Sequence, residues 1–441
     1  MSVSANLVES EEWLSRGDKY MREDNVEKAF ECYSRSIEEN SRSSFAYFKR
    51  GSILLDDEKY KEALNDFNST INLNPNFSFA YLKRGSVFVE TSYWDLALKD
   101  LDRAISLNAD LSFAYYKKAL CFINTRSFDK AKELLDETLK RNPSFADAHL
   151  HFGHIHFESG DYELAIECYN KAFATDPMAK TAIALAITNT KLGRFVDAAR
   201  DYSKAISLEP KSPDAYKNRA LVYMKIKNYE LAIQDFANYI DLEPQDYTAF
   251  NNRGICFFYL RKFENAIWDY TQAIEIEPSM AELFYNRGNT YLNLKMYEDA
   301  YADYSNVILL DPQYTAAYYA RGNALTYMGE HREAIKEFTR ALSFNSRMYL
   351  AYTARGNAYM KLKYYRKAIE DFSLAIEIDY LSANAYLYRG HAFKVTGDNI
   401  ATAKDFIKYI KYAPSSSPNI NTARFWLKNN NFDVPTIDER N

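Results

Sequence analysis

The chain has 441 residues and a formal net charge of −5, with acidic and basic residues interspersed. Hydrophobic residues make up 47% of it, and tyrosine (37) and phenylalanine (28) far outnumber glycine (13) and proline (11). This composition excludes a disordered or low-complexity chain and shows no basic footprint for nucleic acid, so no nucleic-acid partner is expected.

The first residues, MSVSANLVESEEWLSRGD, lack the basic and then apolar order of a signal peptide. No run of about 18 apolar residues occurs in the chain, so we expect no transmembrane helix and no membrane insertion. The sequence therefore predicts a cytoplasmic protein, with residues 1–9 as a flexible N-terminus.

A period of 34 residues organises residues 10–416. The motif FYNRGN at 284–289 returns as YYARGN at 318–323 and as YTARGN at 352–357, 34 residues further on each time. When the glycine of this motif is numbered position 8, the chain reads as twelve consecutive units, and only the unit at 146–178 is one residue short. The units span 10–43, 44–77, 78–111, 112–145, 146–178, 179–212, 213–246, 247–280, 281–314, 315–348, 349–382 and 383–416.

Each unit has the pattern of two amphipathic helices. Position 4 is usually aromatic, position 8 is small, position 20 is alanine in eleven units and position 24 is mostly aromatic. Positions 4, 8 and 11 fall on one face of a first helix, and positions 20, 24 and 27 on one face of a second. We expect the small residue at position 8 to lie opposite the alanine at position 20, so that the two helix backbones approach closely. Proline at position 32, present in eight units, ends the second helix.

This pattern resembles the tetratricopeptide repeat over residues 10–416. The resemblance implies an all-α, right-handed superhelical solenoid of about twelve repeats, in which the first helices line a concave groove. Repeats 4 to 6 (112–212) depart from the pattern, since repeat 6 has Ala182 and Asn189 where aromatic residues are expected. We therefore expect an irregular middle that is softer than the rest.

After the last repeat the pattern changes. The stretch SSSPNINTARFWLKNNNF offers serine caps, a proline near a first turn and the apolar residues Ile420, Phe425, Trp426 and Leu427. It predicts a capping helix over 417–433 that covers the apolar face of repeat 12, followed by a flexible tail over 434–441.

Arginine at position 7 occurs together with an acidic residue at position 23 in eight repeats. We predict an ion pair between the two helices of each, because an arginine removed from water is costly without a partner. Such a pair helps to fix the register of the stack, while its net stabilisation is small. The alternative, that the arginines bind a ligand, remains open. The predicted pairs are Arg50–Asp66, Arg84–Asp100, Arg219–Asp235, Arg253–Asp269, Arg287–Asp303, Arg321–Glu337, Arg355–Asp371 and Arg389–Asp405.

The asparagines of the motif have no packing role in this scheme. The resemblance places positions 2, 5, 6, 9, 12 and 13 of the first helix in the groove. Asparagine is a mediocre helix former, but its amide can donate to a peptide carbonyl and accept from a peptide N–H. A row of asparagines therefore suits an extended peptide, and the arrangement is similar to the asparagine ladder of O-GlcNAc transferase. The predicted peptide-binding residues are Asn218, Asn252, Asn286, Asn289, Asn323, Asn357, Lys217, Asn251, Tyr285 and Tyr319.

Two alternatives concern these surfaces. The alternative for the asparagines is that they are solvated surface residues, although their recurrence in three consecutive units favours the groove. Lys49, Lys83 and Lys117, all at position 6, form a secondary basic row that suits an acidic segment, although recent duplication of repeats 2 to 4 also accounts for them.

Other chemistries find little support. The carboxylate clamp of heat-shock co-chaperones is matched at two of five positions, and Glu282 would repel its ligand. His151 and His154 lie one turn apart without a carboxylate or cysteine ligand on their face, so no metal site is expected. No P-loop, GxSxG, HExxH or kinase signature occurs, so we expect neither an enzyme nor a cofactor. The cysteines occupy packing positions and are expected to be buried thiols: Cys32, Cys121, Cys168 and Cys256.

These observations predict a non-enzymatic adaptor or scaffold that binds an extended peptide of a partner protein in the groove of repeats 7 to 11. The alternative is a structural subunit of a multiprotein assembly, such as a cell-cycle ligase or a ciliary transport particle, that uses its convex face. A heat-shock co-chaperone is less favoured. The sequence leaves the partner and the oligomeric state open.

Overall fold

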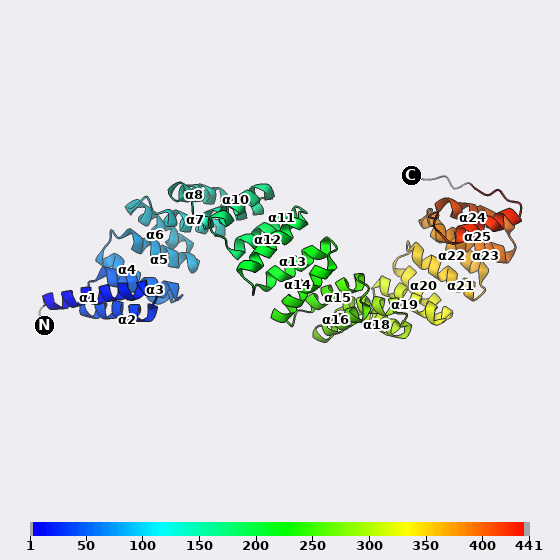
Figure 1. Ribbon diagram of the computed structural model, residues 1–441, viewed down its shortest axis with the longest axis horizontal. Coiled ribbons are helices and arrows are strands. Elements are labelled where there is room, and N and C mark those ends of the chain that lie inside the picture. The colour runs from blue at the N-terminus through cyan, green and yellow to red at the C-terminus, as the bar shows by residue number, and fades with distance from the viewer. Residues whose placement is uncertain (1–2, 436–441) are drawn as a thin grey trace. The chain divides into compact units, whose positions relative to one another are not determined.

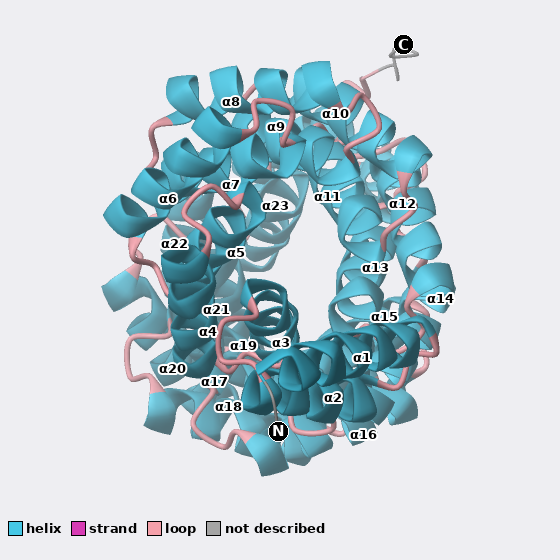
Figure 2. Ribbon diagram, turned by 90° about the vertical axis from the view of Figure 1, so that its left-hand side faces the viewer, coloured by secondary structure: helices cyan, strands magenta, loops and turns pink. Residues whose placement is uncertain are grey.

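The computed structural model describes residues 3–435, which form 25 α-helices and no β-strand (Figures 1 and 2). The helices are α1 (Val3–Arg22), α2 (Val26–Glu39), α3 (Ser44–Asp56), α4 (Tyr60–Leu73), α5 (Ser78–Glu90), α6 (Trp94–Leu107), α7 (Ser112–Asn124), α8 (Phe128–Arg141), α9 (Ala146–Glu158), α10 (Tyr162–Thr175), α11 (Ala179–Lys191), α12 (Phe195–Leu208), α13 (Pro213–Lys225), α14 (Tyr229–Leu242), α15 (Tyr247–Tyr259), α16 (Phe263–Ile276), α17 (Ala281–Asn293), α18 (Tyr297–Leu310), α19 (Thr315–Met328), α20 (His331–Phe344), α21 (Tyr349–Lys361), α22 (Tyr365–Ile378), α23 (Ala383–Thr396), α24 (Asn399–Tyr412) and α25 (Asn419–Asn429). The predicted all-α fold is confirmed.

Each predicted repeat is one helix–turn–helix pair. The odd-numbered helix is its first helix and the even-numbered helix its second, from α1 and α2 in repeat 1 to α23 and α24 in repeat 12. The turn between them holds a residue in the left-handed region at position 15, for example Gly329 (φ 86°) and Lys363 (φ 61°). This conformation ends the first helix and reverses the chain. The segment 112–212, irregular in sequence, forms such pairs as well, and its lower stability stays a prediction.

The contacts divide the chain into two compact units, residues 1–215 and 216–441, and the division falls within α13. First helices of successive repeats contact one another in part of each unit, from α3 through α5 to α7 in the first unit and from α15 to α23 in the second. The second helices of successive described repeats approach one another less. Within a unit the repeats therefore curve toward their first helices.

The glycine at position 8 is required mainly by the ring at position 24. A methyl group built on Gly322 would lie 2.6 Å from Cε1 of Phe338, and one on Gly356 would lie 2.6 Å from Cε1 of Phe372. The ring of the second helix thus lies directly on the backbone of the first. This refines the expectation that position 8 faces the alanine at position 20.

All eight predicted ion pairs between helices are confirmed. In repeat 8, Arg253 donates from Nε and Nη2 to both carboxylate oxygens of Asp269 at 2.9 and 2.7 Å. Burial raises the pKa of Asp269, against the opposing effect of Arg253, so the pair orients the helices more than it stabilises them. In repeat 6, which lacks the arginine, the Asn189 amide donates to Asp201 at 2.9 Å instead.

The two ends differ in part from the sequence-based expectations. Helix α1 begins at Val3, inside the segment 1–9 that was expected to be flexible. The first helix of repeat 1 therefore extends beyond the repeat pattern toward the N-terminus. At the start of the repeat, the Ser10 hydroxyl donates to the Ser36 carbonyl at 2.8 Å. The capping helix is confirmed as α25, in which Ile420, Ala423 and Leu427 are buried. Phe425 is 68% exposed and does not take part in the cap, and Pro418 rather than a serine stands at its N-cap. Of the predicted tail, 436–441 lies outside the described residues.

Candidate functional site

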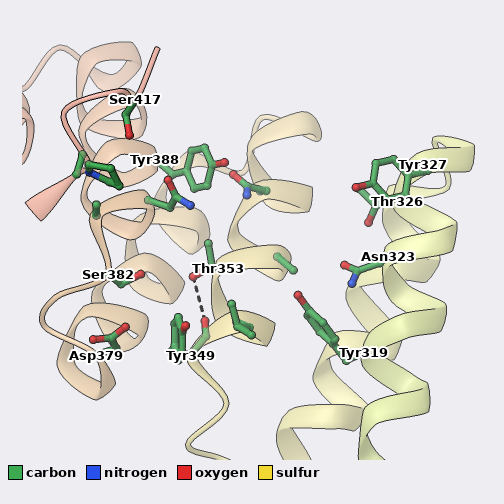
Figure 3. Close-up of a pocket in the computed structure, with 17 residues that line it drawn as sticks. Tyr319, Asn323, Thr326, Tyr327, Tyr349, Thr353, Asp379, Ser382, Tyr388 and Ser417 are labelled. Atoms are coloured by element: carbon green, nitrogen blue, oxygen red, sulfur yellow. Dashed lines mark hydrogen bonds between the residues drawn. The ribbon is translucent and has the colours of Figure 1, made fainter. Parts of the chain in front are cut away.

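A cavity of about 500 Å³ lies among the first helices α19, α21 and α23 of the second unit (Figure 3). In Figure 3, Tyr319, Asn323 and Tyr327 project from α19, and Tyr349 and Thr353 stand on the next first helix. Positions 5, 9 and 13 of repeat 10 and positions 5, 6 and 9 of repeat 11 thus share one cavity. These are positions that the resemblance assigned to the groove.

The cavity carries little charge. Asp379 is the one charged residue among those that line it, and its carboxylate accepts a hydrogen bond from the Leu381 N–H at 3.1 Å. Tyrosine rings and neutral polar groups make up most of the remaining lining. Without a lysine or arginine in the lining, the cavity does not suit a free carboxylate or phosphate.

Asn323 and Asn357 are partly buried and line this cavity. Neither side-chain amide makes a hydrogen bond with another residue of the described part of the chain, 3–435. Position 24 in their repeats is Phe338 and Phe372, and a phenylalanine ring offers no hydroxyl group. Both amides are therefore available to a ligand.

Three other predicted asparagines, Asn251, Asn286 and Asn289, are engaged within the fold. The Tyr304 hydroxyl donates to Oδ1 of Asn289 at 2.9 Å, and the Asn286 amide donates to Oδ1 of Asn251 at 3.0 Å. The first bond joins the two helices of repeat 9, and the second joins repeat 8 to repeat 9. Asn286 and Asn289 also line a smaller cavity of about 230 Å³. Their side chains have a structural role whether or not a ligand binds.

The remaining groove candidates lie apart from the large cavity. Asn218 and Asn252 are partly buried, lack side-chain hydrogen bonds to other described residues, and line neither of the two cavities. The Tyr285 ring packs 5.2 Å from that of Tyr314, the last residue of repeat 9 and the N-cap of α19, so it contributes to packing at the end of repeat 9.

Lys217 is bound to the acidic residue that ends its own repeat and caps the next helix, α15. Its ammonium group donates to Asp246 at 2.7 Å, and Asp246 also accepts from Tyr239 and Thr248. Burial opposes the charge of Asp246, but these hydrogen bonds outweigh burial and lower its pKa below the usual range. Lys217 is therefore an unsuitable group for gripping a ligand.

The basic row on repeats 2 to 4 is partly neutralised. Lys49 lies 3.1 Å from Asp18, and Lys117 lies 2.8 Å from Glu90. Both acids stand on the first helix of the preceding repeat. Lys83 has no acidic partner within 4.0 Å in the part of the chain that the structure describes.

Several lining residues of the large cavity were missing from the sequence-based set. Asn384 and Tyr388 stand at positions 2 and 6 of repeat 12, both groove positions, so the repeat register was a sufficient signal for them. Asp379 and Ser417 come from turns and gave no such signal.

Histidines and cysteines form no further site. The described residues contain no cluster of three or more histidine, cysteine or acidic residues that could hold a metal ion. The rings of His151 and His154 lie 5.4 Å apart, and burial, followed by the nearby His154, lowers the pKa of His151 to about 4. All four cysteines are free, and Cys168 alone among them is not fully buried. None of the helices within 3–435 combines the length and apolar character needed to cross a bilayer.

Comparison with known proteins identifies the repeat. Family models described as tetratricopeptide repeat match residues 116–179, 213–246, 281–314, 315–347 and 349–380. A model described as TPR repeat matches 189–227 and 256–295. The chain therefore contains tetratricopeptide repeats.

Three similar proteins each match a stretch of the chain. Human DnaJ homolog subfamily C member 7 is 35% identical over 79 residues, which are 17% of this chain and 16% of that protein. The crystal structure of MamA is 27% identical, covers 36% of this chain and 93% of its own, and has a TM-score of 0.35. That of YrrB, described as a TPR protein with an unusual peptide-binding site, is 22% identical, covers 44% of this chain and 99% of its own, and has a TM-score of 0.39.

Proposed function

Because the chain is built from tetratricopeptide repeats, we propose that it is a non-enzymatic adaptor that binds an extended segment of a partner protein. The proposed site is the large cavity of repeats 10 to 12. The observation that carries this proposal is the pair Asn323 and Asn357, whose amides line one cavity and have no hydrogen-bond partner within residues 3–435.

The chemistry of the site favours a peptide backbone. Each free amide can donate one hydrogen bond to a peptide carbonyl and accept another from a peptide N–H. The tyrosines around them supply apolar contact area at low conformational cost, since each has only two side-chain torsions. Recognition of the backbone tolerates many side chains, as an adaptor requires.

The asparagines that form hydrogen bonds within the fold limit the proposed site to fewer repeats. Asn286 and Asn289 already hold their repeats together, and Lys217 is paired with Asp246. Repeats 7 to 9 therefore act mainly as support in this proposal, and repeats 10 to 12 carry the recognition. The similarity to the asparagine ladder of O-GlcNAc transferase stays a prediction.

The test compares co-purifying proteins by quantitative mass spectrometry for the wild type, for Asn323→Ala with Asn357→Ala, and for Asn265→Ala. Asn265 is an exposed asparagine on the second helix α16, so its substitution is a matched control outside the cavity. We expect the double variant to lose one small set of proteins that the control retains. Each amide contributes about 1 kcal/mol or more to binding, so a captured segment should bind the double variant about 30-fold more weakly.

Two outcomes would reject the peptide site. One is an unchanged set of proteins in a double variant that is folded by circular dichroism, which would favour a structural subunit that uses its second helices. The other is loss of the same proteins from Asn265→Ala, which would show that the effect does not depend on the cavity.

A further inference from the structure

Repeats 2 to 4 carry a row of exposed phenylalanines that the fold does not require. Phe45, Phe79 and Phe113 stand at position 2 of α3, α5 and α7, and they are 53%, 45% and 41% exposed. In eight of the nine other repeats position 2 holds a charged, polar or small residue. A repeat of this type therefore folds without an aromatic residue here, and the three rings leave apolar surface in water.

The rings make two groups of contacts along the stack. Phe77, in the turn before α5, has its ring centroid 5.3 Å from Phe45 and 6.2 Å from Phe79. Phe113 makes a separate contact with Phe145, at 6.1 Å. Since α3 contacts α5 and α5 contacts α7, these rings lie on adjoining first helices of one unit. They form a phenylalanine row on the side toward which the repeats curve.

A lysine follows each phenylalanine by four residues, on the same helix face. The Lys117 ammonium lies 5.5 Å from the centre of the Phe113 ring. Lys83 has no acidic partner among the described residues, and the Lys49–Asp18 pair is 42% and 41% exposed. An exposed ion pair of this kind contributes little to the stability of the fold, so a carboxylate of a ligand can replace Asp18 as the partner of Lys49.

We propose that this phenylalanine–lysine surface is a second docking site, which binds an acidic segment of a partner protein with regularly spaced apolar side chains. Neighbouring packed helices lie about 8–10 Å apart, and a polyproline II segment has about three residues per turn and advances about 3.1 Å per residue. Every third side chain of such a segment lies on one side, so apolar side chains at this interval meet successive phenylalanines, and acidic residues between them meet Lys49 and Lys83. The site is chemically opposite to the cavity of repeats 10 to 12, which has tyrosines, amides and one carboxylate but no base.

The choice of a peptide over a membrane follows from the shape of the unit. A row of phenylalanines and lysines also suits an anionic lipid surface. Here, however, the row lies on the first helices, toward which the repeats curve, so a flat bilayer cannot reach all three rings together.

The experiment is selection of a displayed library of random peptides on the full chain. Three proteins are compared: the wild type, F45A/F79A/F113A, and the control L96A/L164A/V196A, which truncates three exposed apolar residues on the second helices of the same unit. We expect the wild type and the control to enrich acidic peptides with apolar residues at intervals of about three, and the phenylalanine variant to lose this enrichment. A synthetic peptide from the enriched pool should bind about fivefold to tenfold more weakly for each phenylalanine removed.

Lys83→Glu tests the charge requirement, because it should reduce the share of acidic peptides selected. The proposal is overturned if the wild type enriches no such peptides, if the phenylalanine variant still enriches them, or if the control loses them equally. Binding of the wild type to phosphatidylserine vesicles that is lost in F45A/F79A/F113A would overturn it in favour of a membrane. The variant N323A/N357A should keep this enrichment, so failure of the cavity proposal is separable from failure of this one.

Discussion

Replacing Asn289 by alanine should destabilise repeat 9, whereas replacing Asn323 or Asn357 should not. Asn289 accepts the hydrogen bond of the Tyr304 hydroxyl, and Tyr304 is fully buried. The same pair of positions in repeats 10 and 11 holds an asparagine and a phenylalanine, so no such bond exists there. The three asparagines at position 9 are thus alike in the sequence, but their replacement should change the stability of their repeats by different amounts.

The magnitude follows from the tyrosine left behind. A buried donor without an acceptor costs about 1–3 kcal/mol. Because Asn289 lines a cavity, water can partly replace the amide, and we expect Asn289→Ala to cost about 1–2 kcal/mol. Asn323→Ala breaks no bond and exchanges a mediocre helix former for the best one, which should stabilise its repeat by up to about 0.5 kcal/mol.

Hydrogen exchange under native conditions is the suitable assay, because stability in a repeat array is local. Amides of α17 and α18 should exchange faster in Asn289→Ala, and amides of α19 and α20 should not do so in Asn323→Ala. In the background Tyr304→Phe, which removes the donor, Asn289→Ala should cost close to nothing. Equal destabilisation by both alanine variants, or an undiminished effect in that background, would refute the reasoning.

Three further predictions concern packing, pH and the ion pairs. Gly322→Ala should lower the free energy of unfolding by about 1–3 kcal/mol, because its methyl group would lie 2.6 Å from Phe338. In thermal melts, adding Phe338→Leu should recover much of this loss. No recovery would show that the Phe338 ring is not the obstacle. His151, with a pKa of about 4 when folded, keeps its full contribution above its unfolded pKa of 6.5 and loses it as the pH falls toward 4. His151 should therefore contribute a loss of about 2 kcal/mol between pH 7 and pH 5. His151→Phe should remove this part of the pH dependence and leave the part that comes from His154, whose pKa burial also lowers; an unchanged pH profile would contradict the assignment. Asp269→Ala, which leaves Arg253 unpaired, should cost about 3 kcal/mol, whereas R253M/D269L should unfold at nearly the wild-type denaturant concentration; equal losses in both would mean that the pair itself stabilises the fold.

The repeat fold was readable from the sequence because each contact of the stack recurs at a fixed interval. The eight arginine–acid pairs followed from spacing alone, and α25 followed from the proline and the apolar residues after the last repeat. The repeat register also predicted buried positions for the cysteines, which Cys32, Cys121 and Cys256 occupy and Cys168 occupies only in part. The start of α1 was placed too late, because the residues before Ser10 extend the first helix outside the repeat pattern.

The candidate site was only partly readable, because availability of a side chain depends on its neighbours in space. Asn289 and Asn323 occupy the same position of adjacent repeats, and one is engaged while the other is free. The difference lies in the residue opposite, Tyr304 or Phe338, and its meaning appears only once the two helices are packed. Lys217 likewise reads as a free cation until the fold brings Asp246, 29 residues further on in the turn before α15, beside it.

The sequence by itself determined that the chain is a row of paired helices, since a side chain at a given position repeats the same local contacts in every unit. The tertiary structure alone decided which polar groups remain unpaired and where cavities open. Those properties depend on turns such as those of Asp379 and Ser417 and on cross-repeat partners, which periodicity does not encode.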